Sequence, residues 1–289
     1  MGMRKTVWEI RHTCRIKRYP GDAGYYEIMA SDRPVFRESG WEPTEDPRGG
    51  KKPPKAKKSV QYDNLERAAR RAQVRVRDLA LSNKWDYFVT LTLDRDRIDR
   101  YDMAAITKAL RVWCDNRVRR DGLRYVLVPE RHKDGAIHFH GLFAGVAGVE
   151  SGTYTAAGWR KPRRPRSAAQ LREWQSDPDT YHPVYNLPAW TYGYTTAIPL
   201  YGPPRRAVEY VCKYIGKQGD KPGGRWYYHG GDLKEPQIEY CDLDFREIEA
   251  LEGAYCFTVD AARAAFAVVR GEGYADDIGR VGVAADAQL

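Results

Sequence analysis

Apolar positions in the first third of the chain follow two different spacings. From Tyr62 to about Ser82 they recur every three or four residues, which predicts an amphipathic helix. Residues Trp85–Leu93, WDYFVTLTL, alternate instead and are rich in β-branched and aromatic side chains, which predicts a sheet strand. One face of this strand carries Phe88, Thr90 and Thr92, and the other carries Val89, Leu91 and Leu93.

A second helix and a hairpin follow. Asp102 is a suitable N-cap for a helix that runs to about Arg119 and buries one apolar stripe. Two strands are then predicted at Leu123–Glu130 and Ala136–Phe143. The turn between them, Arg131–Gly135, contains an Asp-Gly pair that suits positive φ.

The segment Pro203–Lys217, PPRRAVEYVCKYIGK, has the spacing of an amphipathic helix. Its prolines suit a helix start, Gly219 suits its end, and a strand at Tyr192–Leu200 leads into it. The helix docks through an apolar stripe and presents two phenols and two ammonium groups on the opposite face. The apolar stripe is Val208, Val211, Cys212 and Ile215, and the polar face is Tyr210, Lys213, Tyr214 and Lys217. A plain surface helix is the alternative reading.

The two ends of the chain differ from its middle. We expect an N-terminal extension at 1–59, with short strands at Thr6–Ile10 and Tyr25–Ala30 and a basic, Pro-rich linker at its end. The main domain is expected at 60–232. An acidic C-terminal extension at 233–289 contains one predicted helix, Asp260–Arg270, and a weakly structured end.

Charge is distributed unevenly along the 289 residues. Residues 233–289 hold 12 acidic and 5 basic side chains, whereas the first 232 residues hold 43 basic and 27 acidic ones, a net charge of +16. A body this basic indicates a polyanionic partner, and nucleic acid is the default. The five scattered cysteines contain no CxxC pair, and no apolar run has the length of a membrane span. We therefore expect a soluble protein of the cytoplasm with free thiols.

The second hairpin strand contains the sequence His138-Phe139-His140. Spacing of two on a strand places both imidazoles on one face, and Glu130 closes the neighbouring strand beside them. Two imidazoles and a carboxylate suit a divalent ion that keeps open positions for substrate. A chance or structural histidine pair is the alternative. A cupin would place its glutamate a few residues after the histidines, where this chain has Ala144 and Gly145.

Residues 150–192 have the composition of an insertion that mixes basic and aromatic side chains. Such a mixture is what a groove for single-stranded nucleic acid needs, because cations contact phosphates and rings stack on bases. An ordinary loop with scattered aromatics is the alternative. The candidate DNA-binding residues are Arg160, Lys161, Arg163 and Arg164 here, and Arg206 in the predicted Tyr/Lys helix.

Three motifs in order resemble the HUH endonuclease superfamily of rolling-circle replication initiators. They are FVTLTL at 88–93, HFH at 138–140 with Glu130 upstream, and YVCKYIGK at 210–217. The paired tyrosines are most similar to the two-tyrosine branch, which includes the gene A replication protein of phiX-type phages. The resemblance covers roughly residues 85–220 and leaves both ends of the chain outside it.

The resemblance implies an α+β fold with a central antiparallel sheet and flanking helices, RRM-like or ferredoxin-like. It implies that Glu130, His138 and His140 hold Mg²⁺ or Mn²⁺ at the scissile phosphate. One tyrosine then attacks single-stranded DNA at a replication origin, giving a 5′-phosphotyrosyl link and a free 3′-hydroxyl, and the bond is later rejoined. Lys213 and Lys217 would favour the phenolate or stabilise charge on phosphorus.

In two-tyrosine relatives the second tyrosine cleaves the regenerated junction while the first still holds DNA. Tyr210 and Tyr214 would share these roles, and the order is open. The chain has no GxxxxGK[ST] phosphate loop, so a host helicase and polymerase are implied as partners, with no membrane.

Three other readings remain. A two-tyrosine HUH transposase would use the same chemistry, although such enzymes usually carry an N-terminal zinc-binding module and this chain has no CxxC pairs. A non-catalytic DNA-binding protein would not need the histidines and tyrosines together. A metal-dependent oxygenase would leave the double tyrosine and the basic body unexplained.

Overall fold

The computed structural model describes residues 2–9, 13–21, 25–33, 36–44, 58–159, 161–200, 205–216, 221–259 and 264–271. In these residues the chain is α+β, with three sheets in which the paired strands are antiparallel. The chain divides into two compact units. One is Lys58–Glu235, and the other combines Met1–Lys57 with Pro236–Leu289.

The Lys58–Glu235 unit is built on a seven-stranded sheet of order β11-β6-β7-β5-β10-β9-β8. The strand β5 lies at its centre and pairs with β7 on one side and β10 on the other. The strands are β5 (Tyr87–Leu93), β6 (Arg124–Arg131), β7 (Ile137–Ala144), β8 (Val149–Thr155), β9 (His182–Asn186), β10 (Gly193–Pro199) and β11 (Tyr228–Gly230).

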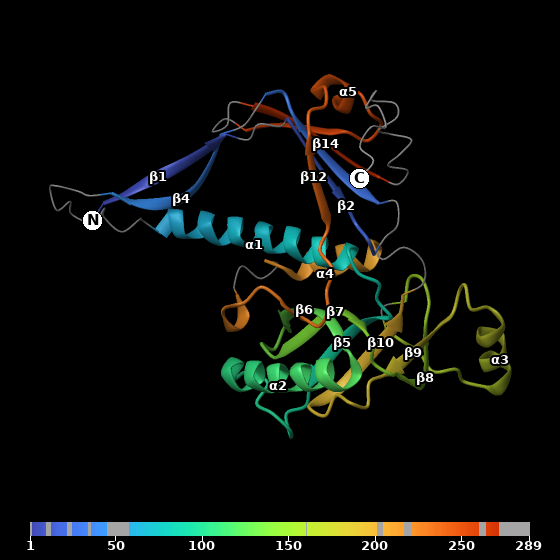
Figure 1. The fold of residues 1–289 in the computed structure, drawn as a ribbon. Helices are drawn as coiled ribbons and strands as arrows, with labels where there is room; N and C mark the ends of the chain where they lie inside the picture. The colour runs from blue at the N-terminus through green and yellow to red at the C-terminus, as the bar shows by residue number, and fades with distance from the viewer. Residues whose placement is uncertain are drawn as a thin grey trace. The chain divides into compact units, whose positions relative to one another are not determined.

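Helices cover both faces of this sheet (Figure 1). One face carries α2 (Met103–Asp121), and the other carries α1 (Lys58–Leu81) and α4 (Arg205–Tyr214). A shorter helix, α3 (Ala168–Ser176), and a 3-10 turn at Pro222–Gly224 complete the unit. The predicted helices and strands at 62–143 and 192–200 are confirmed to within a few residues.

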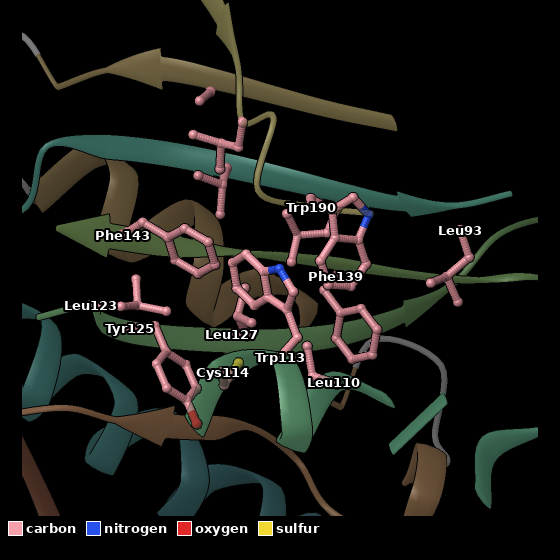
Figure 2. Close-up of a cluster of buried hydrophobic side chains, with 14 of the residues drawn as sticks. Leu93, Leu110, Trp113, Cys114, Leu123, Tyr125, Leu127, Phe139, Phe143 and Trp190 are labelled. Carbon is pink, nitrogen blue, oxygen red and sulfur yellow. The ribbon is translucent and has the colours of Figure 1, made fainter. Parts of the chain in front are cut away.

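The α2 face holds an apolar core (Figure 2). It receives alternate residues of the central strands, among them Leu91 and Phe139, which are fully buried. Trp113 of α2 packs against Phe143 and Trp190, with ring centroids 5.9 and 5.2 Å away. This is the face that the alternation of Trp85–Leu93 assigned to Val89, Leu91 and Leu93.

Helix α2 begins after its predicted cap and extends slightly beyond its predicted end near Arg119. The Asp102 carboxylate accepts hydrogen bonds from the amides of Ala104 and Ala105, which makes it the N-cap. Gly122 adopts φ 69° at the C-terminus, a left-handed conformation that glycine adopts without strain.

Residues 150–192 are more ordered than a loop. They contain β8, α3 and β9, and the two strands extend the seven-stranded sheet beyond β10. Trp174 of α3 is 5% exposed and packs on Tyr154, Trp159 and Tyr181. The extra strands need an apolar cover of their own, and these rings supply it.

The other unit contains a five-stranded sheet of order β12-β2-β3-β14-β13 and a separate β1-β4 pair. Its core includes Ile16, Ile28 and Val269, together with Ile248 from the short helix α5 (Phe245–Glu249). The strands are β1 (Gly2–Glu9), β2 (Cys14–Arg18), β3 (Tyr26–Ser31), β4 (Phe36–Thr44), β12 (Gln237–Cys241), β13 (Tyr255–Val259) and β14 (Ala264–Gly271).

The predicted helix at Asp260–Arg270 is wrong. Residues 264–271 form β14, which pairs with β3 on one side and β13 on the other. Alanines favour a helix in isolation, but Phe266, Val268 and Val269 suit a strand, and two flanking strands provide its hydrogen bonds. The basic linker and the C-terminal end of the chain lie outside the described residues.

No helix in the described part of the chain combines the length and the apolar character needed to cross a membrane. All five cysteines are free.

Candidate active site

The α4 face of the seven-stranded sheet is partly apolar, but unlike the α2 face it carries a cluster of polar side chains around the two histidines. Directly paired residues of antiparallel strands point to the same face, so the register arranges the side chains in rows across β6, β7, β5 and β10. The first row is Val126, Leu142, Phe88 and Ile198. The second is Val128, His140, Thr90 and Thr196, and the third is Glu130, His138, Thr92 and Tyr194.

His140 is held on three sides. Its Nδ1 is hydrogen-bonded to the Thr90 hydroxyl at 3.1 Å, and its Nε2 lies 2.9 Å from Oε2 of Glu130. Both side chains are mostly buried, with 13% of His140 and 18% of Glu130 exposed. The ring of Tyr214 stacks on the imidazole almost in parallel, with centroids 4.3 Å apart and planes at 11°.

His138 is positioned in the same way by the next threonine. Its Nδ1 lies 3.3 Å from the Thr92 hydroxyl, and the ring of His132 stacks on it at 5.1 Å. Burial, and then the neighbouring imidazole of His132, lowers the pKa of His138 below its ordinary value. The neutral ring, which is the form that ligates metals, is therefore favoured.

Helix α4 docks as its apolar stripe predicts, with Val208, Val211 and Ile215 buried. It ends at Tyr214, and Gly216 with φ 79° supplies the left-handed turn, whereas Gly219 lies outside the described residues.

Helix α1 holds the end of α4. The Gln73 amide donates hydrogen bonds to the carbonyls of Ile215 at 3.0 Å and Cys212 at 3.5 Å. The Cys212 thiol in turn lies 3.6 Å from the Gln73 carbonyl. The turn that carries Tyr214 is thereby fixed against α1.

The two tyrosines occupy different environments. Tyr214 is half-buried over His140, whereas Tyr210 is 46% exposed. Their rings meet edge to face at 5.1 Å, and the Tyr210 ring also packs against Phe88 at 5.3 Å. Burial, followed by the Tyr210 hydroxyl and the Glu130 carboxylate, raises the pKa of Tyr214 above its ordinary value. Without a nearby cation this phenol stays protonated at neutral pH.

The role predicted for the two lysines stays a prediction. Lys213 is exposed on α4, and Lys217 lies outside the described residues.

The predicted metal ligands lie on one sheet face, but no set of three or more His, Cys, Asp and Glu side chains in the described residues is spaced to hold an ion. Glu130 contacts His140 directly instead. The donor chemistry nevertheless fits a divalent cation. Threonine hydroxyls hydrogen-bond to both Nδ1 atoms, so the Nε2 atoms of His138 and His140 are the ring nitrogens left to bind a metal. The Glu130 carboxylate lies beside Nε2 of His140.

The predicted DNA-binding cations are dispersed. Lys161, Arg163 and Arg164 are exposed in the β8–α3 segment, where the Arg163 guanidinium lies over the Trp159 ring at 4.4 Å. Arg160 lies outside the described residues. Arg206 is on α4, one turn before Tyr210, and lines a cavity of about 640 Å³ with Arg205, Glu209 and Leu200 among others.

The aromatic residues of 150–192 are occupied by packing. Trp174 and Trp190 are 5% and 4% exposed, and Trp159 and Tyr181 pack against Trp174. These rings contribute to the core of the added strands, and the stacking groove expected from this composition stays a prediction.

Sequence reasoning missed the side chains that orient the site. The sequence places Thr90 and Thr92 on the correct face but indicates no role for them, and it gives no sign that His132 stacks on His138. Gln73 was not singled out at all. Only the pairing of β5 with β7 reveals the threonine contacts, since the partners lie 46 and 50 residues apart in the chain.

Residues 86–219 match a family described as replication-associated protein ORF2/G2P. The matched segment begins at the edge of β5 and ends just beyond α4, so it contains both histidines, both tyrosines and Glu130, and it leaves α1 outside. No curated protein and no solved structure gives a significant match to the chain. The family match supports a rolling-circle replication initiator.

Proposed function

We propose that this protein initiates rolling-circle replication by nicking single-stranded DNA at an origin with a tyrosine of α4. The observation that carries the proposal is the contact of Tyr214 with His140, at a ring distance of 4.3 Å, beside Glu130. A stack of phenol, imidazole and carboxylate between α4 and the sheet is expected of a two-tyrosine HUH nuclease with an RRM-like sheet. This stack lies within the segment that matches the replication-associated family.

Glu130, His138 and His140 would hold Mg²⁺ or Mn²⁺. When bound, such an ion draws charge from a non-bridging oxygen of the scissile phosphate and favours the phenolate. Thr90 and Thr92 keep the two imidazole planes fixed by holding their Nδ1 atoms. The raised pKa of Tyr214 agrees with this requirement, because burial, Tyr210 and Glu130 all disfavour the phenolate.

The nick is a transesterification. The tyrosine oxygen loses its proton to solvent and forms a bond to phosphorus, while the bond from phosphorus to the 3′-oxygen breaks and that oxygen takes up a proton. The products are a 5′-phosphotyrosyl link and a free 3′-hydroxyl that primes synthesis. Attack by a 3′-hydroxyl on the phosphotyrosine reverses the step and rejoins the strand without ATP.

Two tyrosines allow two linked reactions. Tyr214 lies against the histidines, whereas the more exposed Tyr210 contacts Tyr214 and Phe88. In this scheme one tyrosine retains the DNA while the other cleaves the regenerated junction. A host helicase and polymerase would act on the nicked DNA in the host cytoplasm.

Covalent capture tests the proposal. The full chain, Mn²⁺ and single-stranded DNA from its own replicon are incubated and separated on a denaturing gel, with Tyr210→Phe, Tyr214→Phe and the double variant in parallel. A metal-dependent adduct that only the double variant abolishes supports two nucleophiles. Loss of the adduct in one single variant would mean a one-tyrosine enzyme.

Retained DNA binding without an adduct under any metal would contradict catalysis and leave a DNA-binding protein. Phenylalanine keeps both ring contacts, so loss of reaction cannot be attributed to lost packing.

A further inference from the structure

Tyr194 is an exposed aromatic side chain on the face of the sheet that carries the site. It lies on β10 and is 71% exposed, the largest exposure of any large hydrophobic side chain in the described residues. The described residues make no aromatic or hydrogen-bonded contact with its side chain. Within the described part of the chain this ring is therefore available to a ligand.

The register places Tyr194 in the row of the candidate metal ligands. Its Cα partner on β5 is Thr92, whose hydroxyl bonds His138, and the Cα partner of His138 on β6 is Glu130. Directly paired residues share a face, so Tyr194 and His138 point to the same side. Two strand spacings separate them, about 10 Å.

The neighbouring row members explain why a base fits here. Thr92 in the same row and Thr196 in the next row have small side chains, and the Tyr194 ring is 71% exposed beside them. A phenol ring on an open sheet surface offers a flat π-face to a nucleobase, and stacking of this kind accepts any base.

We propose that Tyr194 is the stacking residue for one base of the single-stranded DNA close to the nick. This rests on the proposed function, since it takes the scissile phosphate to lie at the histidines. A span of about 10 Å corresponds to no more than about three nucleotides of one strand, at a rise of 3.4 Å or more per nucleotide. The stacked base therefore belongs to the immediate flank of the nick, and its stacking strengthens binding of the DNA.

The test uses the full chain with Tyr194→Ala, Tyr194→Phe and Tyr194→Trp. Stacking predicts that the alanine variant binds DNA roughly tenfold or more weakly, while phenylalanine and tryptophan retain binding. The loss is expected in KM for nicking, with kcat little changed. Tyr240→Ala is the matched control, because Tyr240 is also an exposed strand tyrosine, 52% exposed, but belongs to the five-stranded sheet.

Single abasic substitutions along the DNA then locate the base. One abasic position within about three nucleotides of the mapped nick should weaken wild-type binding and have no further effect on Tyr194→Ala. 2-Aminopurine at that position should be quenched on binding to wild type and not to the alanine variant.

Equal sensitivity of both proteins at every position, or a phenylalanine variant as weak as alanine, would overturn the stacking role. These binding measurements do not require cleavage. If no DNA is nicked but one abasic position weakens binding of the wild type and not of Tyr194→Ala, the nuclease proposal fails. A stacking role of Tyr194 in DNA binding then remains, without a link to a nick. If DNA is nicked and no position couples, only the present inference fails.

Discussion

The two faces of the seven-stranded sheet are made by alternate residues of the same strands, yet they differ sharply where the two histidines lie. On β7, Phe139 is fully buried under α2, whereas its neighbours His138 and His140 lie on the α4 face among hydroxyls and a carboxylate. The apolar face can bury its side chains without partners. The polar face has to satisfy each buried donor and acceptor individually, so each contact there has an identifiable structural or chemical purpose.

The comparison predicts the largest stability effect on the α2 face. Phe139→Ala should lower the free energy of unfolding by about 3 to 5 kcal/mol, because a fully buried ring is replaced by a cavity. Denaturant unfolding of the wild type and variant measures the difference. His140→Ala is the control one residue along the strand, and it should cost clearly less. Equal losses for the two variants would remove the distinction between the faces.

The largest effect on reaction is expected on the α4 face. His140→Ala removes the imidazole that contacts Glu130, Thr90 and Tyr214. We therefore expect the rate of adduct formation to fall more than about 100-fold, which exceeds the loss typical of a residue that only orients a metal ligand. The rate of covalent capture measures it. Removal of divalent ions with EDTA should abolish the wild-type adduct, and Mn²⁺ should restore it. A wild-type rate that survives EDTA would argue against the metal.

A smaller effect separates the ligands from the residues that orient them. Thr90→Val keeps the shape of the side chain but leaves Nδ1 of His140 without its 3.1 Å partner. Adduct formation or metal affinity should fall about 10- to 100-fold. Thr90→Ser, which keeps the hydroxyl, should restore most of the rate. If valine and serine variants behave alike, the hydroxyl has no orienting role.

The sequence predicted the two faces well because strand alternation depends on local residue type alone. Val89, Leu91 and Leu93 lie in the core as expected, and His138 and His140 lie opposite them. The apolar stripe of α4 was predicted equally well, because Val208, Val211 and Ile215 have helical spacing and all three are buried.

The errors came from features that depend on tertiary pairing. Nothing local indicates that Thr90 meets His140 or that Trp174 is enclosed by other rings. The strand Ala264–Gly271 is a further example of a feature that depends on tertiary pairing. Its alanines favour a helix in isolation, and it forms a strand because it pairs with β3 and β13. Local composition predicts faces and periods, whereas register decides which side chains meet.

The smallest effect tests whether the polar face depends on a helix outside the segment that matches the replication-associated family. Gln73 of α1 donates to the Ile215 and Cys212 carbonyls, and the Cys212 carbonyl also accepts from the Ile215 amide. Gln73→Leu should lower the free energy of unfolding by about 1 to 3 kcal/mol, because the part-buried Ile215 carbonyl loses the Gln73 donor. It should also slow adduct formation, because the turn with Tyr214 can move away from His140.

Two further variants serve as controls. Gln73→Glu removes the amide donor while keeping a side chain of similar size, whereas Gln73→Asn keeps an amide on a shorter side chain. If loosening of Tyr214 is the cause, kcat falls in the leucine and glutamate variants while KM for DNA is retained, and asparagine recovers part of the rate. A uniform loss of binding and rate in all three variants would show that α1 supports the fold as a whole and does not specifically position the tyrosine.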